Sequence, residues 1–270
     1  MVNSAQIASF QKKILTYYQK NHRNLPWRTT TNPYYILLSE IMLQQTQVDR
    51  VIPYYQDWIS TWPTIHDLAQ ASRVDVLKKW IGLGYNNRAV RVHELANTVS
   101  TTYQGDLLKA IKETKLPGIG PYTQHAVRIF AANEDLTTID TNIRRILIHE
   151  FHLPESISDE ELQSLAHQCL PQGKSRDWHN ALMDYGATFL TSRKTGIKPK
   201  TQQSKFEGSD RQIRAMILRY LLKKSKKCSI LDIQKALHLS MKERKIKNIL
   251  KDMIRDDLVL EEDNRYTIKS

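Results

Sequence analysis

Apolar residues recur at helical intervals through almost the whole chain, and the alternation typical of a β-strand is not sustained before the last dozen residues. Short loops marked by Gly and Pro separate the helical segments. Because such faces are buried by packing helix on helix, the sequence predicts an all-α main domain over residues 1–190. The predicted helices are residues 5–19, 34–46, 67–70, 74–80, 88–101, 107–113, 122–132, 141–151, 159–169 and 177–190.

The chain changes character after this main domain. Residues 191–208 are polar and basic, which indicates a linker, with an ordered surface loop as the alternative. Residues 209–270 contain an amphipathic helix, two further helices that Ser229 and Ser240 can cap, and a polar turn between two short apolar stretches. Three helices followed by a hairpin predict a small winged helix-turn-helix-like domain. These segments are 213–222, 230–237, 241–256, 258–260 and 266–268.

The net charge of +12 indicates a polyanionic partner, of which nucleic acid is the commonest. From Lys205 onward the chain holds 17 Lys and Arg against 10 Asp and Glu, so more than half of the excess lies in the last quarter of the chain. We interpret the C-terminal domain as a DNA-contacting element, with protein docking or dimerisation as the alternative.

Apolar runs and cysteine spacing indicate where the protein acts and whether it binds a metal through cysteine. No apolar run approaches the ~20 residues of a membrane span, and residues 1–11 lack a signal-peptide pattern, so we expect a cytoplasmic, nucleoid-associated monomer that contacts no membrane. The cysteines of the sequence, Cys169 and Cys228, form no Cys-x-x-Cys pair, which predicts two reduced thiols and no cysteine-bound metal.

The sequence Leu-Pro-Gly-Ile-Gly at 116–120 predicts a tight turn between two helices, since Gly118 and Gly120 permit backbone geometry that other residues avoid. The next helix begins at about Pro121, so its unpaired N–H groups and positive end would face out of the turn. A DNA phosphate fits such a position and would be bound without any reading of base sequence. An ordinary helix–helix turn is the alternative.

Two carboxyl groups are the candidate catalytic pair. Asp140 precedes a predicted helix and can cap it, and capping N–H donors would keep its side chain ionised. Glu40 has apolar helical neighbours such as Ile36 and Leu37, so we expect it on a buried face, where its pKa rises. A rotated helix with Glu40 at a wet edge is the alternative. A raised-pKa acid beside an ionised carboxylate is the pair that breaks glycosidic bonds.

Six ordered segments resemble the MutY adenine glycosylases, a family of the helix-hairpin-helix (HhH-GPD, endonuclease III) superfamily. The resemblance covers roughly residues 9–190, and Leu-Gln-Gln-Thr-Gln is its most specific piece. It implies a two-lobed helical domain that flips a mispaired base out of duplex DNA and removes it. The segments are 25–28, 38–47, 82–85 with 88–89, 116–123, 140–142 and 181–186.

The resemblance implies catalytic roles for four residues. Glu40 matches the glutamate that protonates adenine at N7, and Asp140 matches the aspartate that stabilises the sugar cation. Tyr122 and Asn142 match residues that assist at the sugar. Tyr122 stands where relatives with β-lyase activity carry a lysine, and a phenol cannot form a Schiff base, so we predict a monofunctional glycosylase.

The resemblance also implies a DNA-binding surface. Tyr85 and the pair Gln44–Gln45 match residues that wedge into the duplex around the opposing base, and the uncharged amides there can pair with bases. The hairpin at 116–120 often binds a monovalent cation through backbone carbonyls in this family, and we expect no other cofactor. The predicted DNA-binding residues are Gln44, Gln45, Gln47, Tyr85, Arg88, Leu116, Gly118, Gly120 and Thr123.

The chain departs from the family pattern in two places. Most members carry Cys-x6-Cys-x2-Cys-x5-Cys after the segment that matches 181–186, and these cysteines bind an iron–sulfur cluster. Here those places hold Leu190, Ile197, Lys200 and Phe206, so we expect no cluster. MutY proteins usually end in a Nudix-like β-rich domain that helps to recognise 8-oxoguanine opposite adenine, and here the small helical domain takes its place.

Three function hypotheses remain open on the sequence. The first is excision of adenine opposite 8-oxoguanine or guanine. The second is a thymine or uracil glycosylase for G·T or G·U mismatches, since that relative shares the hairpin, the aspartate and a stretch resembling residues 174–177. The base pocket around Arg28, Met183 and Asp184 would decide between these two. The third is a mismatch-binding or damage-binding protein that does not cut, and intact Glu40 and Asp140 argue against it.

Overall fold

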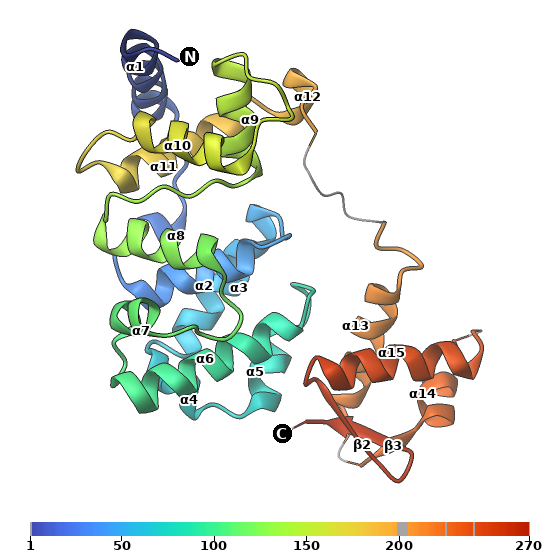
Figure 1. The fold of residues 1–270 in the computed structure, drawn as a ribbon. Coiled ribbons are helices and arrows are strands. Elements are labelled where there is room, and N and C mark those ends of the chain that lie inside the picture. Colours follow the sequence, from blue (N-terminus) through green and yellow to red (C-terminus); the bar gives the residue numbers. More distant parts are fainter. Residues whose placement is uncertain (1, 199–204, 225, 240, 270) are drawn as a thin grey trace. The chain divides into compact units, whose positions relative to one another are not determined.

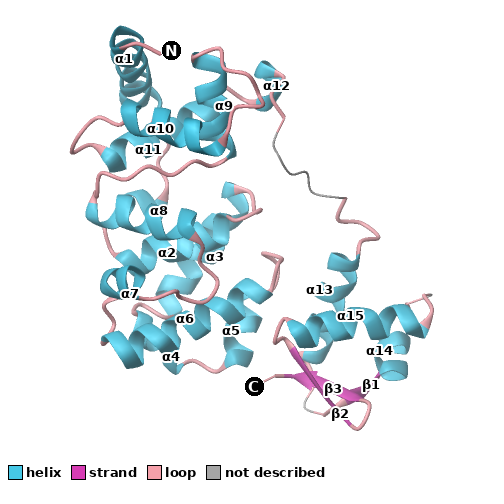
Figure 2. Ribbon diagram, viewed as in Figure 1, coloured by secondary structure: helices cyan, strands magenta, loops and turns pink. Residues whose placement is uncertain are grey.

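A computed structural model of the chain describes residues 2–198, 205–224, 226–239 and 241–269. The chain divides into two compact units. One consists of Met1–Glu40 with Ile119–Gln202, and the other of Ile41–Gly118 with Gln203–Ser270. Helices dominate both units, and the strands that the structure describes fall in the C-terminal residues (Figure 2). None of the described helices has the length and apolar character needed to cross a membrane.

The unit that contains the N-terminus is built from helices with well-defined caps. Asn3 and Ser158 each form a capping box at the start of a helix, and Asp140 caps another. Their apolar faces meet in one core, in which Phe10 packs edge-to-face on Trp178 at 5.5 Å between ring centroids. The elements are α1 (Ser4–Asn21), a 3₁₀ turn (Pro26–Arg28), the start of α2 (Pro33–Leu43), α8 (Pro121–Ala132), α9 (Thr141–Glu150), α10 (Asp159–Cys169), α11 (Ser175–Asp184), a π-helical turn (Tyr185–Phe189) and α12 (Ser192–Thr195), as Figure 1 shows.

The first part of the other unit is also helical. Its core holds three tryptophans in edge-to-face contact, with Trp58 at 4.8 Å from Trp62 and 5.4 Å from Trp80 between ring centroids. Between α5 and α6 the backbone turns sharply through Gly82, where an added Cβ would lie 1.9 Å from the Tyr54 hydroxyl, so only glycine fits. The helices are α3 (Val48–Thr61), α4 (Ile65–Gln70), α5 (Arg73–Trp80), α6 (Asn87–Tyr103) and α7 (Leu107–Glu113).

The C-terminal residues contain three helices and a three-stranded antiparallel sheet in the order β1-β3-β2. Glu262 lies opposite Arg265 across a two-residue turn, Asp263–Asn264, in which both residues have positive φ, as a type I′ hairpin requires. Helix, strand, two helices and a hairpin are the order of a winged helix-turn-helix. The elements are α13 (Asp210–Leu221), β1 (Cys228–Ser229), α14 (Ile230–Ala236), α15 (Glu243–Arg255), β2 (Val259–Glu262) and β3 (Arg265–Ile268).

Most predicted helices are present, and the differences have local causes. Helix α3 is not among the predicted helices because Pro53, a residue that removes a helical hydrogen bond, lies inside it. Helix α2 ends at Leu43 rather than 46, because Gln45 adopts a left-handed φ of 59°. Helix α15 begins at Glu243 after Lys242, not at 241, and the predicted cap Ser240 lies outside the described residues.

Further differences concern the other elements. The predicted helix 177–190 is continuous only to Asp184, after which it widens into the π-helical turn. The short helix α12 occupies part of the predicted linker, whose residues 199–204 lie outside the described ones. Strand β1 has two residues, too few for any alternation to show in the sequence.

Candidate active site

Asp140 is held at the start of α9 by donors on both of its carboxylate oxygens. One oxygen accepts the backbone N–H of Ile143 at 2.7 Å, and the other accepts the side-chain amide of Asn142 at 3.0 Å. Burial raises the pKa of Asp140 above its ordinary value, while these donors and the charge of Arg145 act in the opposite direction. Asp140 therefore caps the helix, as predicted, and its reactive group has a fixed position.

Glu40 lies on α2, one turn after the fully buried Leu37. Burial, followed by the nearby charge of Asp140, raises the pKa of Glu40 from 4.5 to about 7, and a hydrogen bond from the Tyr122 phenol lowers it in part. The two predicted carboxyl groups therefore lie in one site and influence each other. A carboxyl group with a pKa near neutrality can act as a general acid at physiological pH.

Tyr122 is the second residue of α8 and lines a cavity together with Asp140. Burial and the charges of Glu40 and Asp140 hold the pKa of its phenol well above the ordinary value. The phenol is therefore neutral at physiological pH and acts as a hydrogen-bond donor to Glu40.

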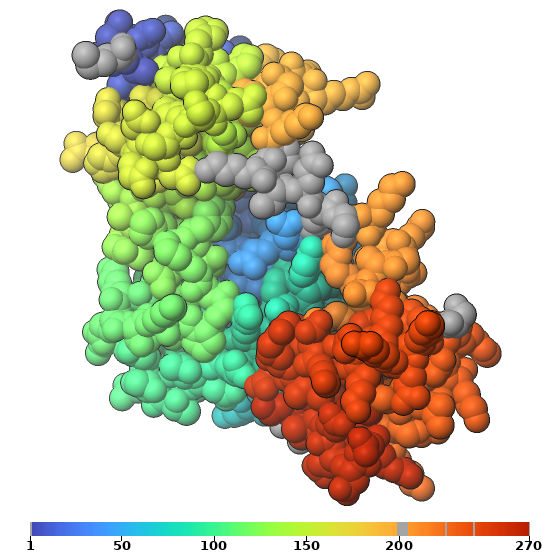
Figure 3. Space-filling model, turned by 45° about the vertical axis from the view of Figure 1, so that its right-hand side comes forward, coloured from blue at the N-terminus to red at the C-terminus, as the bar shows by residue number. Residues whose placement is uncertain are grey.

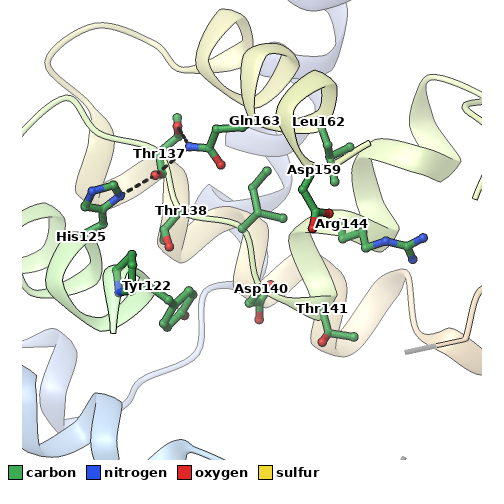
Figure 4. Close-up of a pocket in the computed structure, with 12 residues that line it drawn as sticks. Tyr122, His125, Thr137, Thr138, Asp140, Thr141, Arg144, Asp159, Leu162 and Gln163 are labelled. Atoms are coloured by element: carbon green, nitrogen blue, oxygen red, sulfur yellow. Dashed lines mark hydrogen bonds between the residues drawn. The ribbon is translucent and has the colours of Figure 1, made fainter. Parts of the chain in front are cut away.

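A cavity of about 570 Å³ is lined by two of the candidate catalytic residues, Tyr122 and Asp140. Figure 4 shows Tyr122 and Asp140 along one side of it, with Arg144 and Asp159 beyond Asp140 and Gln163 at the far end. A nucleotide presents an apolar ring, hydroxyl groups and a phosphate, and this mixed lining offers partners for each of them.

Asn142 and Arg145 connect Asp140 to the π-helical turn. The Asn142 oxygen accepts a hydrogen bond from Arg145 at 2.7 Å, and the same guanidinium donates to the carbonyl oxygens of Gly186 and Leu190, both at 2.8 Å. Arg145 is buried, with 6% of its surface exposed. Asn142 matches the predicted site, whereas Arg145 was not predicted, although a basic residue among Ile143, Ile146 and Leu147 is a signal in the sequence.

Further residues that were not predicted fix the extended segment that leads to Asp140. The backbone N–H of Thr138 donates to His179 at 3.4 Å, and the other ring nitrogen of this buried histidine lies 2.7 Å from the Ser175 carbonyl. Gln163 donates to the hydroxyl and carbonyl oxygens of Thr137 at 2.6 and 3.1 Å. These partners lie many residues apart, so no local sequence pattern reveals them.

The predicted base-pocket residues Arg28 and Asp184 bind each other. The guanidinium of Arg28 contacts both oxygens of Asp184, at 2.6 and 2.8 Å, and Arg23 donates to the same carboxylate. Asp184 is fully buried, and Met183 beside it is partly exposed. This pairing fixes the 3₁₀ turn before α2 to the end of α11, and a role in base selection stays a prediction.

The predicted DNA-binding residues of the other unit surround a turn that Arg88 organises. Its guanidinium donates to the carbonyl oxygens of Gln44 at 2.7 Å and Gly84 at 3.0 Å. It also donates to carbonyl oxygens in the last turn of α2. Arg88 is 7% exposed and burial lowers its pKa to about 10. It therefore lies inside the unit rather than on the surface, and the exposed side chains of this turn are those of Gln45 and Gln47.

Tyr85 is more exposed, with 37% of its surface accessible and a left-handed φ of 48°. The Arg88 guanidinium lies 5.6 Å from its ring centroid, and Arg211 donates to its hydroxyl at 2.8 Å. Cation–π contacts of this kind hold an aromatic ring in one orientation at the surface. That rigidity fits the predicted wedge, which remains a prediction.

The predicted hairpin has the expected geometry. Gly118 has a φ of 75°, and an added Cβ would lie 2.5 Å from Arg91 Cβ. Gly120 is the N-cap of α8, Pro121 is its first residue, and both glycines are exposed. The side chains of Leu116 and Thr123 are buried, so they are not part of the exposed surface of the turn. An exposed turn of glycine carbonyls and N–H groups suits either a phosphate or a monovalent cation.

The residues at the four cysteine positions of cluster-bearing relatives cannot bind iron. Leu190 and Ile197 are buried apolar side chains, Phe206 is half exposed, and Lys200 lies outside the described residues. Across the described residues there is also no group of three or more His, Cys, Asp or Glu that could hold a metal ion. Buried apolar side chains therefore occupy two of these four positions, Leu190 and Ile197.

Comparison with known proteins defines the class. The model of the HhH-GPD superfamily of base excision DNA repair proteins matches residues 38–172, which include Glu40, Tyr122 and Asp140. The structure of a thermostable thymine-DNA glycosylase matches with a TM-score of 0.63 and 31% identity over 73% of this chain and 91% of that chain. Fold, site and family model together define a helix-hairpin-helix DNA glycosylase, a hydrolase of base excision repair, as predicted.

Two more comparisons refine this assignment. A trapped endonuclease III–DNA covalent intermediate matches with a TM-score of 0.62 over 74% of this chain and 92% of that chain, and its 20% identity bears on the fold alone. The adenine DNA glycosylase of Mycobacterium tuberculosis is 34% identical over 232 residues, which cover 76% of this chain and 76% of the relative. Within the superfamily, the chain belongs to the MutY-like adenine DNA glycosylases.

Proposed function

We propose that the protein hydrolyses the N-glycosidic bond of adenine mispaired with 8-oxoguanine or guanine in duplex DNA. The observation that carries the proposal is the pair of unlike carboxyl groups. Glu40 has a pKa of about 7, and Asp140 is held by N–H donors on both oxygens. The 34% identity to an adenine DNA glycosylase supports adenine as the base that is removed.

In the proposed reaction the adenine nucleotide leaves the helical stack, which a mismatch makes less costly. The neutral Glu40 carboxyl group gives its proton to N7, and the bond between C1′ and N9 breaks as the base leaves. The sugar becomes an oxocarbenium ion, and the Asp140 carboxylate stabilises its positive charge. Water then adds its hydroxyl group to C1′, and its remaining proton passes to a carboxylate of the site.

In this proposal the product is an abasic site, and the enzyme does not cleave the DNA strand. A β-lyase reaction needs an amine that forms a Schiff base with the opened sugar, and Tyr122 offers a phenol at that position. The enzyme is therefore monofunctional and needs neither an iron–sulfur cluster nor another metal for the steps above. We infer that it acts as a monomer.

The test is single-turnover cleavage of labelled duplexes that hold one central A·8-oxoG, A·G, A·C, T·G or U·G pair, with hot alkali revealing abasic sites. Breaks confined to adenine, and visible only after alkali, are the expected result. Asp140→Asn and Glu40→Gln should each abolish excision and keep mismatch binding. Near wild-type cutting by either variant would refute the role given to that residue.

A second candidate is removal of thymine or uracil opposite guanine. It is favoured by the 31% identity to a thymine-DNA glycosylase. Breaks at T or U in the same panel would establish it. Tight mismatch binding with no breaks in any duplex would instead indicate a non-catalytic mismatch-binding protein.

A further inference from the structure

Helix α15 carries a row of basic side chains along one exposed face. Arg244, Lys247, Lys251 and Arg255 are spaced three or four residues apart, so they follow one another along the helix surface. All four are exposed, and the uncharged, exposed Asn248 lies within the row. We call these five residues the α15 basic stripe. Figure 3 shows this end of the chain, in red, at the surface of the molecule.

The opposite face of α15 fixes the direction in which the stripe points. This face consists of buried apolar side chains, those of Ile246, Leu250 and Met253, each with 0% of its surface exposed. Beside the stripe, Lys245 forms an ion pair with Asp210 of α13 at 3.0 Å. A rotation of the helix that hid the stripe would expose this apolar face, so the stripe is a permanent surface feature.

The charges of the stripe are weakly compensated within the fold. Arg255 pairs with Asp252 on the same helix, but both side chains are largely exposed, and such pairs contribute little. Among the described residues, none forms an ion pair with Arg244, Lys247 or Lys251. The stripe therefore presents a concentrated positive charge to solvent.

The hairpin of the same domain carries the opposite charge. Glu261, Glu262 and Asp263 are exposed at or beside its turn, where the positively charged neighbours are Arg265 and Lys227, which pairs with Glu262. Negative charge at the hairpin tip opposes contact with phosphates, whereas the helix favours it. A duplex bound here would therefore be held by the helix and not by the hairpin.

We propose that the α15 basic stripe is a second duplex-DNA contact of this enzyme, which binds the phosphate backbone without reading base sequence. The stripe contains no apolar anchor, and Lys is depleted from the buried centres of protein–protein interfaces, so a protein partner fits it less well. Long cationic side chains in a row suit the regular charges of a duplex. The proposal rests on the proposed function only in taking duplex DNA as the substrate.

The test compares two full-length variants of equal charge, Lys247→Gln with Lys251→Gln in the stripe and Arg219→Gln on α13 with Lys223→Gln in the turn after it. Binding of an undamaged duplex is measured as a function of salt concentration. The stripe variant should flatten the plot of log affinity against log salt by about 2 units of slope. It should also weaken binding on the order of tenfold per lost contact at ~0.1 M salt. The control should match the wild type.

The outcomes separate this proposal from the proposed function. Equal slopes for the stripe variant and the control would overturn the proposal, because the stripe would then have another partner or none. A flattened slope supports it whether or not the protein excises any base, since undamaged DNA is the probe. Thermal unfolding of both variants checks that they are folded.

Discussion

At the scale of single residues, the site makes two similar carboxyl groups unlike by giving them different surroundings. Burial and the nearby charge of Asp140 favour the protonated form of Glu40, against the hydrogen bond that it receives from a neutral phenol. Asp140 receives N–H donors on both oxygens, which favour its carboxylate against the effect of burial. Environment rather than residue type therefore suits the two groups to the proposed roles of acid and stabiliser.

The first prediction concerns the pH dependence of excision. Because the general acid must carry its proton, the single-turnover rate on A·8-oxoG should be level below about pH 7 and fall roughly tenfold per pH unit above it. Rates measured between about pH 5 and pH 9 check this. A rate that rises through neutrality would assign Glu40 the role of a base instead. A slowed Tyr122→Phe variant should show this falling limb at a higher pH, since loss of the phenol donor raises the pKa of Glu40.

The second prediction concerns stability. The raised pKa means that the folded state holds the Glu40 proton more tightly than the unfolded chain, so stability due to this group is lost as pH rises from about 4.5 to about 7. Glu40→Gln removes that loss. In urea unfolding, the variant and the wild type should have the same free energy of unfolding below about pH 5. At about pH 8 the free energy of unfolding of the variant should be higher by about 1–3 kcal/mol. An equal difference at both pH values would place the Glu40 carboxyl group in water.

At the scale of elements, the π-helical turn connects the end of α11 to the catalytic aspartate. Gly186 lies in this turn, and an added Cβ would lie 2.9 Å from Asn142 Cβ and 3.1 Å from Ile146 Cδ1. The absence of a side chain there lets Arg145 reach the carbonyl oxygens of the turn. A substitution in the turn should therefore displace Asn142 and so alter the hydrogen bond that Asn142 donates to Asp140.

The third prediction follows from this contact. Gly186→Ala should lower the free energy of unfolding by about 1–3 kcal/mol, as overpacking does, and should slow excision by displacing Asn142. Gly196→Ala is the control, because its surroundings are open and only its left-handed φ of 74° opposes the change. Excision by the control should remain at the wild-type rate. If both variants excise equally well, the turn has no influence on the site.

Sequence patterns predicted the elements best where the signal is local. Asp140 and Ser229 cap their helices as expected, since a cap and its helix are adjacent in the chain. Long-range partners were not predictable in this way. The contacts of Arg145 with Gly186 and of His179 with Thr138 depend on how helices pack, and Arg88, expected on the DNA surface, is buried by carbonyl oxygens more than 40 residues away.

At the scale of the whole molecule, two of the positions at which the family pattern predicts cluster-binding cysteines hold buried apolar side chains. Leu190 lies in the main core of its unit and Ile197 is buried. The fourth prediction is that the purified protein contains no stoichiometric iron and lacks the visible absorption of a cluster. Chelation should leave both its unfolding temperature and its excision rate unchanged. Loss of either on chelation would show a metal that this chain needs.

The position of Asp140 also has a consequence for how such an enzyme can be lost in evolution. Its side chain caps a helix and, in the proposed mechanism, also serves the chemistry, and asparagine is an equally good cap. On that mechanism, one base change in the codon would give a folded protein that still binds the mismatch and cannot repair it. Such a protein would shield the lesion from other repair routes, so this change would harm a genome more than deletion of the gene.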